Sequence, residues 1–300
     1  MTQRAAPDAQ ADSSTLGSLM VQACRRLEAA GIEGADREAR WLIEYALGLT
    51  RASQLLDRTR PLAEREIAKV DDYVTRRAAR EPLQYILGTQ EFCGLEFEVN
   101  PAVLIPRPET ELLVQEVIRR LPQGVRPTVV DVGTGSGCLA VTLAHALPAA
   151  RVLATDLSVD ALETAKRNAR RHGVETSISW LEGDLLAPLA GLGCEEAVTA
   201  ILANPPYIRE SEWSGLQPEV SGYEPRMALV AGVNGTELHE RLLAEAASYL
   251  SPGGFLAMEL GQGQSGHIRR KIETMSAYGR MEIVPDEVGN DRIVIVERVR

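Results

Sequence analysis

The first part of the chain carries hydrophobic residues with a helical period. Six of them are spaced as on one face of a helix: Leu16, Leu19, Met20, Ala23, Cys24 and Leu27. Thr15 is expected to cap the start of this helix and Gly31 to end it. The same period predicts a second helix over residues 36–48 and a third that opens at Pro61. No strand pattern interrupts this region, so residues 15–86 are predicted to form a small helical bundle.

Two short stretches on either side of this bundle have other patterns. Residues 1–14 lack an apolar run, so they are predicted to be a disordered tail, neither a signal peptide nor a transit peptide. Apolar and acidic positions alternate over residues 95–99, as in a strand with one buried face. Prolines then recur over residues 101–108. Residues 87–110 are therefore predicted to be a β-hairpin followed by a stiff, proline-rich connector.

From residue 111 onward predicted strands and helices alternate, with apolar strands at 128–133, 151–156, 177–183, 197–203 and 254–260. Helices are predicted between them, over 136–147, from Ser158 onward, over 236–250 and over 264–278. This alternation indicates a parallel sheet covered by helices on both faces. Two further strands, 281–285 and 292–299, leave no room for a crossover helix and should pair antiparallel. The predicted fold of residues 111–300 is α/β, a doubly wound and mostly parallel sheet whose last strand is antiparallel.

Composition narrows the function classes without identifying one. The chain has 300 residues, of which 45% are apolar, and its 32 basic and 42 acidic residues give a net charge of −10. This balance argues against a protein whose main affinity is for nucleic-acid phosphates. The four cysteines form no C-x-x-C pair, so neither a disulfide framework nor a metal site is expected. No apolar run approaches about 18 residues, so no membrane span is expected, and the predicted location is cytoplasmic.

Candidate chemistry is sought beyond the carboxyl ends of the strands, where parallel sheets bind ligands. The first of these strands ends in DVGTGSGC, in which Asp131 is followed by Gly133, Gly135 and Gly137. Glycines let the backbone approach a nucleotide-like ligand closely, although a tight strand–helix turn would also use them. Cys138 stands where a G-x-G-x-x-G dinucleotide motif would have its third glycine. The spacing therefore favours an adenosine ligand without a pyrophosphate over a nicotinamide cofactor.

Acidic residues follow the next two predicted strands. Asp156 could accept both ribose hydroxyls of an adenosine, and its alternative role is to cap the helix that starts at Ser158. Asp184 could accept from an adenine amino group while Leu185 packs against the ring, and its alternative role is that of a solvated turn residue. Together with the glycine loop and the antiparallel terminal strands, these positions resemble the S-adenosylmethionine-dependent methyltransferase fold.

The fourth predicted strand ends in NPPY, residues 204–207. Neither proline can donate a ladder hydrogen bond, so the strand must stop there. The Asn204 side-chain oxygen and the Pro205 carbonyl could accept the two hydrogens of a planar nitrogen and aim its lone pair at a methyl donor, while Tyr207 lies flat against it. An Asn-Pro-Pro turn with a partly buried tyrosine is the alternative. The acceptor would be either adenine in nucleic acid or a glutamine or asparagine amide in protein, and the net charge favours protein.

Longer segments resemble the PrmC/HemK family of glutamine methyltransferases, which modify peptide chain release factors. The segments that carry the resemblance are EPLQYILGTQEFCGLEFEVNPAVLIPRPETE (81–111), DVGTGSGCLAV (131–141), NPPYI (204–208), YEP (223–225), ALVAG (228–232), LSPGGFLAMELG (250–261) and DEVGNDR (286–292). NPPY is shared with adenine methyltransferases, whereas LIPRPETE is much more specific. The resemblance extends from about residue 81 to the end and is only architectural before it.

The resemblance implies an enzyme that transfers a methyl group from S-adenosyl-L-methionine, leaving S-adenosyl-L-homocysteine, to the glutamine of the Gly-Gly-Gln motif of class 1 release factors without a metal. With Asp184 included, the donor site would comprise Gly133, Thr134, Gly135, Ser136, Gly137, Asp156, Asp184, Leu185 and Asn204. The acceptor amide would meet Asn204, Pro205, Pro206 and Tyr207, of which Asn204, Pro205 and Tyr207 are the predicted catalytic residues. Leu185 stands where relatives can have an aromatic residue, so stacking on adenine would be weaker.

Partners and rival functions follow from the same residues. The helical domain, 15–86, carries no catalytic constellation and is predicted to recognise the release factor, while neither a membrane nor direct nucleic-acid binding is expected. An adenine-N6 methyltransferase acting on nucleic acid is the alternative function. A nicotinamide-linked oxidoreductase is disfavoured by Cys138, and a non-catalytic docking protein by the intact NPPY. GQGQ, residues 261–264, is interpreted as a turn that opens the helix at 264.

Overall fold

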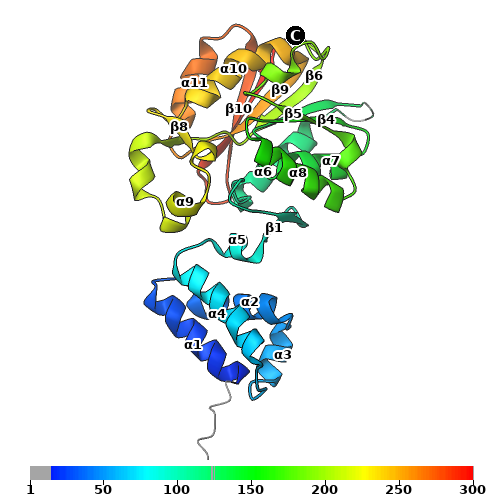
Figure 1. Cartoon of the computed structure of the whole chain (residues 1–300). Coiled ribbons are helices and arrows are strands. Elements are labelled where there is room, and N and C mark those ends of the chain that lie inside the picture. The colour runs from blue at the N-terminus through cyan, green and yellow to red at the C-terminus, as the bar shows by residue number, and fades with distance from the viewer. Residues whose placement is uncertain (1–14, 123, 125, 300) are drawn as a thin grey trace, which may run out of the picture. The chain divides into compact units, whose positions relative to one another are not determined.

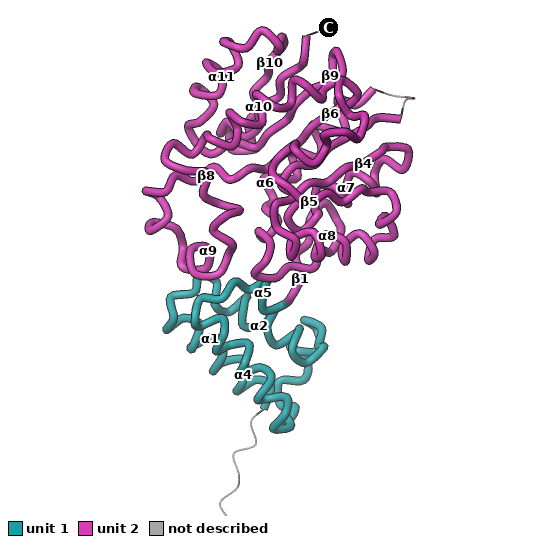
Figure 2. The backbone as a smooth tube through the Cα atoms, turned by 45° about the horizontal axis from the view of Figure 1, so that its top comes forward, with its two compact units in different colours: residues 1–87 teal, residues 88–300 magenta. Residues whose placement is uncertain are grey.

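The computed structural model describes residues 15–122, 124 and 126–299, so the predicted tail at 1–14 lies outside the described residues. The described chain packs as two units that divide between Leu87 and Gly88 (Figure 2). The first unit consists of helices, and the second contains the main sheet with its flanking helices (Figure 1).

The helical unit is built mainly from three helices, α1 (Leu16–Ala29), α2 (Ala35–Leu47) and α4 (Glu64–Ala78). Their apolar faces meet in one core, and its fully buried members include Leu16, Leu27, Leu42 and Ile43. The predicted cap of α1 is confirmed, because Thr15 Oγ1 accepts a hydrogen bond from Ser18 N at 3.2 Å. Gly48 follows α2 in the left-handed conformation that favours glycine.

The third predicted helix starts later than expected. Pro61 forms an isolated bridge with Thr15 instead of opening the helix, and α4 begins at Glu64. The Glu66 carboxylate accepts a hydrogen bond from Ala63 N at 2.9 Å, which satisfies one donor at the helix start. Two short helices were not predicted, α3 (Arg51–Leu56) and α5 (Leu83–Leu87), because they span too few turns to show a period.

A hairpin opens the second unit, as the alternating pattern predicted. β1 (Thr89–Phe92) pairs antiparallel with β2 (Leu95–Glu98), and the rings of Phe92 and Phe97 are buried in the core of this unit. Helix α6 (Pro108–Arg120) starts inside the predicted connector, with Pro108 in its first turn. The Glu111 side chain accepts a hydrogen bond from Cys93 N at 2.8 Å, so α6 holds the tip of the hairpin.

The main sheet of the described chain has the spatial order β10-β11-β9-β6-β3-β4-β5. Its strands are β3 (Thr128–Val132), β4 (Arg151–Asp156), β5 (Ile178–Glu182), β6 (Val198–Ala203), β9 (Leu250–Glu259), β10 (Tyr278–Pro285) and β11 (Asp291–Arg298). Strands β3, β4, β5, β6 and β9 run parallel, while β11 lies antiparallel between β9 and β10. The predicted fold class, with its reversed last strand, is confirmed.

Helices cover both faces of this sheet (Figure 1). α6, α7 (Cys138–Ala146) and α8 (Val159–Arg171) pack on one face, and α10 (Glu237–Tyr249) and α11 (Ser265–Glu273) on the other. The helix predicted over 264–278 is too long, because it ends at Glu273 and β10 already begins at Tyr278. The Tyr278 hydroxyl donates to the Leu243 carbonyl at 2.6 Å, which fixes the start of the strand against α10. None of the helices in the described residues is long and apolar enough to cross a membrane.

Short elements between β6 and α10 were not predicted. They are β7 (Ile208–Arg209), the 3₁₀ helix η3 (Glu210–Gly215), α9 (Pro218–Tyr223), the 3₁₀ helix η4 (Arg226–Ala228) and β8 (Val230–Gly232). Two further 3₁₀ turns, η1 (Glu175–Ser177) and η2 (Ala187–Leu189), flank β5. β7 pairs parallel with β8, so the intervening segment forms a loop that returns to the same place.

Candidate active site

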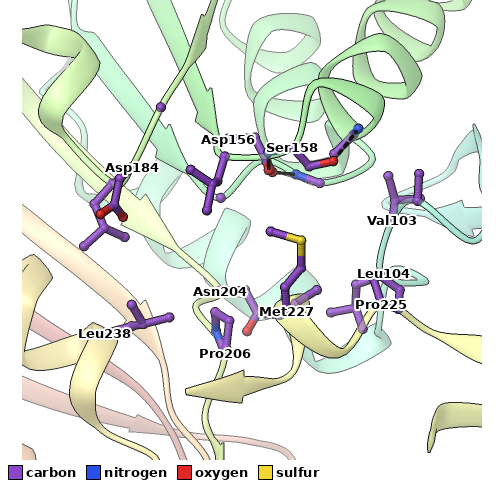
Figure 3. A pocket seen from close by; sticks show the side chains of 18 residues that line it. Val103, Leu104, Asp156, Ser158, Asp184, Asn204, Pro206, Pro225, Met227 and Leu238 are labelled. Atoms are coloured by element: carbon purple, nitrogen blue, oxygen red, sulfur yellow. Dashed lines mark hydrogen bonds between the residues drawn. The ribbon is translucent and has the colours of Figure 1, made fainter. Parts of the chain in front are cut away.

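A cavity of about 180 Å³ opens beyond the carboxyl ends of β3, β4, β5 and β6 (Figure 3). Residues that follow these strands line it: Gly133, Gly135, Asp156, Leu157, Ser158, Gly183, Asp184, Leu185, Asn204 and Pro206. Figure 3 shows Asp184 and Leu238 at one end of the cavity and Val103, Leu104 and Pro225 at the other. Carboxylates and an amide therefore project into a space with mainly apolar walls, at the sheet edge where the sequence predicted a ligand.

The glycine loop after β3 contributes backbone to this cavity. Gly133 and Gly135 line it with φ values of 71° and 55°, which glycine adopts without strain. Gly137 does not line it; a Cβ there would lie 2.9 Å from the Ala165 Cβ, so this glycine permits the close approach of α7 to α8. Thr134 and Ser136 are buried outside the lining. Of the five predicted loop residues, only Gly133 and Gly135 border the cavity.

Asp131 holds this loop from inside the protein. Its Oδ2 accepts hydrogen bonds from Thr134 Oγ1 at 2.6 Å and from Ala140 N at 3.1 Å, so one carboxylate joins the loop to the first turn of α7. The side chain is fully buried, and this burial raises its pKa to about 7. Asp131 is thus an anchor behind the glycine loop and does not line the cavity.

Asp156 lines the cavity, and two backbone N–H groups hold its carboxylate. Its Oδ1 accepts a hydrogen bond from Ser158 N and its Oδ2 one from Gly135 N, both at 2.8 Å (Figure 3). The N-cap of α8 is Ser158, whose Oγ accepts a hydrogen bond from Ala161 N at 3.2 Å, so Asp156 holds the cap residue and is not itself the cap. Burial raises its pKa, while the backbone donors favour the charged form. Because each oxygen has a second acceptor direction, the carboxylate can still receive hydroxyl groups from a ligand.

The end of β5 places two more predicted residues on the lining. The Asp184 side chain is exposed, and its Oδ2 accepts a hydrogen bond from Arg241 at 2.7 Å, so this carboxylate is already paired. Leu185 has an unusual positive φ of 47°, and its carbonyl accepts a hydrogen bond from Thr155 Oγ1 at 2.9 Å. The cavity wall beside Asp184 is consequently held by hydrogen bonds from β4 and α10.

The NPPY segment enters the cavity through Asn204 and Pro206. The Asn204 amide donates from Nδ2 to Thr110 Oγ1 at 3.1 Å, which leaves Oδ1, the other end of the amide, available to accept a hydrogen bond from a ligand. Pro205 is buried and Tyr207 is partly buried, and neither lines the cavity. The structure thus brings Asn204 and Pro206 to the cavity together with Gly133, Gly135, Asp156, Asp184 and Leu185.

Tyr207 is fixed through its backbone and its ring. Its carbonyl accepts a hydrogen bond from Gln264 Nε2 at 2.9 Å, and a Cβ on Gly261 would lie 2.9 Å from its Cδ2 atom. Burial raises the pKa of its phenol to about 12, so the hydroxyl stays protonated near neutral pH. The interpretation of 261–264 as a turn before α11 is confirmed, but its role in holding Tyr207 was missed.

Two buried groups behind the site were also missed by the sequence reasoning. Thr110 Oγ1 donates to Glu259 Oε2 at 2.6 Å, so Asn204, Thr110 and Glu259 form one hydrogen-bonded chain. Thr110 belongs to LIPRPETE and Glu259 to LSPGGFLAMELG, two segments that carried the family resemblance without an assigned role. Their presence in those segments was the one feature of the sequence that could have marked Thr110 and Glu259 as candidate site residues.

A buried carboxylate joins two segments that wall the cavity. Glu224 accepts a hydrogen bond from Ile105 N at 3.1 Å and is ion-paired with Arg107. It therefore links the segment that carries Val103 and Leu104 to the segment that carries Pro225 and Met227 (Figure 3). Glu224 belongs to YEP, and Ile105 and Arg107 belong to LIPRPETE, so two segments of the resemblance are in contact here. No group of three or more His, Cys, Asp or Glu side chains in the described ranges could hold a metal ion.

Family models and known proteins agree with this architecture. Residues 18–88 match the PrmC N-terminal domain and residues 108–216 the methyltransferase small domain. A release factor glutamine methyltransferase of Moorella thermoacetica is 43% identical over 95% of this chain and 99% of its own. One of Geobacter sulfurreducens is 47% identical over 78% of this chain and 80% of its own, and one of Nitratidesulfovibrio vulgaris is 40% identical over 97% of each.

Solved structures show the fold alone. The hMettl16 catalytic domain, in complex with MAT2A 3′UTR hairpin 6, matches with a TM-score of 0.55 at 16% identity, covering 76% of this chain and 82% of that one. The family is shown by the sequence identity of 40–47% to the three release factor glutamine methyltransferases. This chain is a methyltransferase and belongs to the release factor glutamine methyltransferase family.

Proposed function

We propose that this chain transfers the methyl group of S-adenosyl-L-methionine to the side-chain amide nitrogen of the glutamine in the Gly-Gly-Gln motif of class 1 release factors. The names of its relatives support the reaction, and the single observation that carries the site assignment is the hydrogen bond from Asn204 to Thr110. That bond uses the amide donor of Asn204 and leaves an acceptor for the hydrogens of a substrate amide.

The residues of the cavity fit the methyl donor, whose sulfonium supplies an electrophilic methyl group. Asp156 offers a carboxylate for ribose hydroxyls, and Gly133 and Gly135 offer backbone that can approach a ligand closely. Asp184 and Leu185 would border the adenine. The apolar walls would limit the access of water, a competing nucleophile, to the methyl group once the ligands are bound. Thr134, Ser136 and Gly137 would support the loop from behind.

The acceptor nitrogen of glutamine is a poor nucleophile because its lone pair is delocalised into the carbonyl group. Asn204 Oδ1, at the cavity, would take one of its hydrogens, and the carbonyl of Pro205, the next residue along the chain and outside the cavity lining, would take the other, so that the lone pair is aimed at the methyl group. Pro206 would border the amide, and the Tyr207 ring would lie against its plane. This neutral acceptor pair would also stabilise the positive charge that develops on the nitrogen during transfer.

The helical unit is proposed to recognise the release factor. It has its own core and contributes no residue to the cavity that lies within the second unit. Residues 18–88 match the PrmC N-terminal domain, a family model separate from that of the methyltransferase domain, which supports a separate role for the helical unit.

The test is incubation with labelled S-adenosylmethionine and purified release factor, followed by peptide mapping. Label should appear on the Gly-Gly-Gln glutamine and disappear when that glutamine is replaced. Asn204→Ala should slow transfer by about 10²–10³-fold, the usual effect of losing one preorganised polar group. Tyr207→Phe should be milder because the ring remains, and Asn234→Ala, which removes an exposed amide outside the cavity, should have no effect. Near-normal turnover by folded Asn204→Ala, or preferential labelling of adenine in duplex DNA, would overturn the proposal.

A further inference from the structure

Asn204 is the cavity end of a chain of hydrogen-bonded polar side chains that continues into the protein core. Asn204 Nδ2 donates to Thr110 Oγ1 at 3.1 Å, and Thr110 Oγ1 donates to Glu259 Oε2 at 2.6 Å. Thr110 is 3% exposed and Glu259 1%, and neither lines the cavity. Thr110 lies on α6, Asn204 directly after β6, and Glu259 at the end of β9, so the fold brings together residues from distant parts of the chain.

The directions of these hydrogen bonds depend on the charge of Glu259. A threonine hydroxyl has one hydrogen, so when an ionised Glu259 accepts it, Thr110 can only accept from Asn204. The Asn204 NH₂ group then faces Thr110 and its oxygen faces the cavity. If Glu259 is protonated and donates to Thr110, the threonine hydrogen is free to point at Asn204. The amide would then turn over and present its NH₂ group to the cavity, where a substrate amide needs an acceptor.

We infer that Glu259 is a positioning residue that acts through the Thr110 hydroxyl to orient the Asn204 amide with its oxygen toward the acceptor. This inference rests on the proposed function for the identity of the acceptor, although the orientation itself is a property of the free enzyme. An ionised Glu259 also polarises the chain and makes Asn204 Oδ1 a stronger acceptor, since linked hydrogen bonds strengthen one another.

The surroundings of Glu259 let its charge change near neutral pH. Burial opposes ionisation and raises its pKa to about 7, while positive side chains nearby favour the charged form. The titratable groups that act on it from neighbouring elements are Arg107 and Glu109 at the start of α6, Tyr207 after β6 and Arg292 on β11. His239 of α10 donates from Nε2 to the Glu259 main-chain carbonyl at 2.8 Å, and burial lowers the pKa of this imidazole, so it stays neutral. Of these groups, Glu259 is the one bonded to Thr110.

The experiment compares kcat and KM for release factor methylation as a function of pH. Thr110→Val removes the hydroxyl at nearly constant volume, Thr110→Ser restores it, and Glu259→Gln removes the charge. Thr142→Val is the matched control, because Thr142 is a buried threonine on α7 whose hydroxyl has no hydrogen-bond partner among the described residues. Thermal unfolding checks that each variant is folded.

Thr110→Val should lower kcat by about 10–100-fold with little change in KM, less than the about 10²–10³-fold expected for losing the acceptor itself. Glu259→Gln should keep a larger part of kcat, because its amide oxygen can still accept from Thr110, but it has no charge that changes with pH. The wild type should gain kcat as the pH rises through about 7, and these two variants should lose that rise. Thr110→Ser should restore both the rate and the pH profile, and Thr142→Val should match the wild type. Wild-type kcat and pH profile in either folded Thr110→Val or folded Glu259→Gln would overturn the inference.

A second measurement separates this inference from the proposed function. In protein labelled with ¹⁵N-asparagine, the Asn204 side-chain resonances should shift as the pH passes through about 7 in the wild type and stay constant in Thr110→Val and Glu259→Gln. If the wild type labels no release factor, the proposed function fails while this titration still decides the orientation. A titration unchanged in both variants refutes the role of Glu259 whatever the substrate is.

Discussion

Removal of the Asp156 carboxylate tests the donor side of the cavity. Gly135 N and Ser158 N hold its two oxygens at 2.8 Å each, so the group is already positioned before a ligand arrives. Asp156→Ala would remove the acceptor for two ribose hydroxyls. Hydrogen bonds to charged groups contribute about 1.5–3 kcal/mol each, and water in the emptied space would replace part of that. We expect a net loss of about 2 kcal/mol in donor binding, which corresponds to an increase in Kd of about 30-fold.

Isothermal titration calorimetry with S-adenosylmethionine and with S-adenosylhomocysteine measures this loss directly. Asp160→Ala is the matched control, because Asp160 is an exposed aspartate in the first turn of the same helix and does not line the cavity. The control removes the same charge from the start of α8, so it accounts for the interaction of that charge with the helix dipole. An unchanged Kd in folded Asp156→Ala would refute the ribose contact and leave Asp156 only its role of holding Gly135 N and Ser158 N.

Two further predictions concern the helical unit and the buried carboxylates. A protein that starts at Gly88 should bind S-adenosylhomocysteine like the full chain and methylate intact release factor poorly; a full kcat/KM would exclude a recognition role for residues 15–87. Folding raises the pKa of Glu259 from its ordinary value of 4.5 to about 7, so the folded protein holds this proton more tightly than the unfolded chain does. The resulting stabilisation is fully present below pH 4.5 and is lost as the pH rises to about 7. Urea unfolding should therefore show Glu259→Gln gaining stability relative to the wild type as the pH rises from 4.5 to 8, by at most about 3 kcal/mol at about 1.4 kcal/mol per pH unit. A difference independent of pH would mean that Glu259 is ionised throughout this range.

The position of the cavity could be predicted because local patterns define it. Strand ends are visible in the sequence where an apolar run meets a glycine, an aspartate or a proline, and parallel strands bring all those ends to one edge. Asp156, Asp184 and Asn204 each follow such a run, and all three line the cavity. Thr134 and Ser136 were assigned with the same loop, but the loop turns these two side chains into the protein instead of the cavity. A contiguous motif identifies a loop and does not reveal which of its side chains face inward.

The hydrogen bonds that hold the site could not be predicted, because they join residues far apart in the sequence. Thr110 and Asn204 are 94 positions apart, and Thr110 and Glu259 are 149 apart. Gln264 is harder still to predict, since its side chain binds main-chain atoms: it donates to the Tyr207 and Gly235 carbonyls and accepts from Gly261 N. A hydrogen bond to a main-chain atom requires no particular residue type at the partner position, so the sequence contains no pair of side chains from which it could be predicted. A buried glutamine that satisfies three backbone groups is costly to replace, because every substitute leaves at least one of them without a partner. Local sequence thus indicates which groups meet the ligands, and tertiary packing determines how those groups are held.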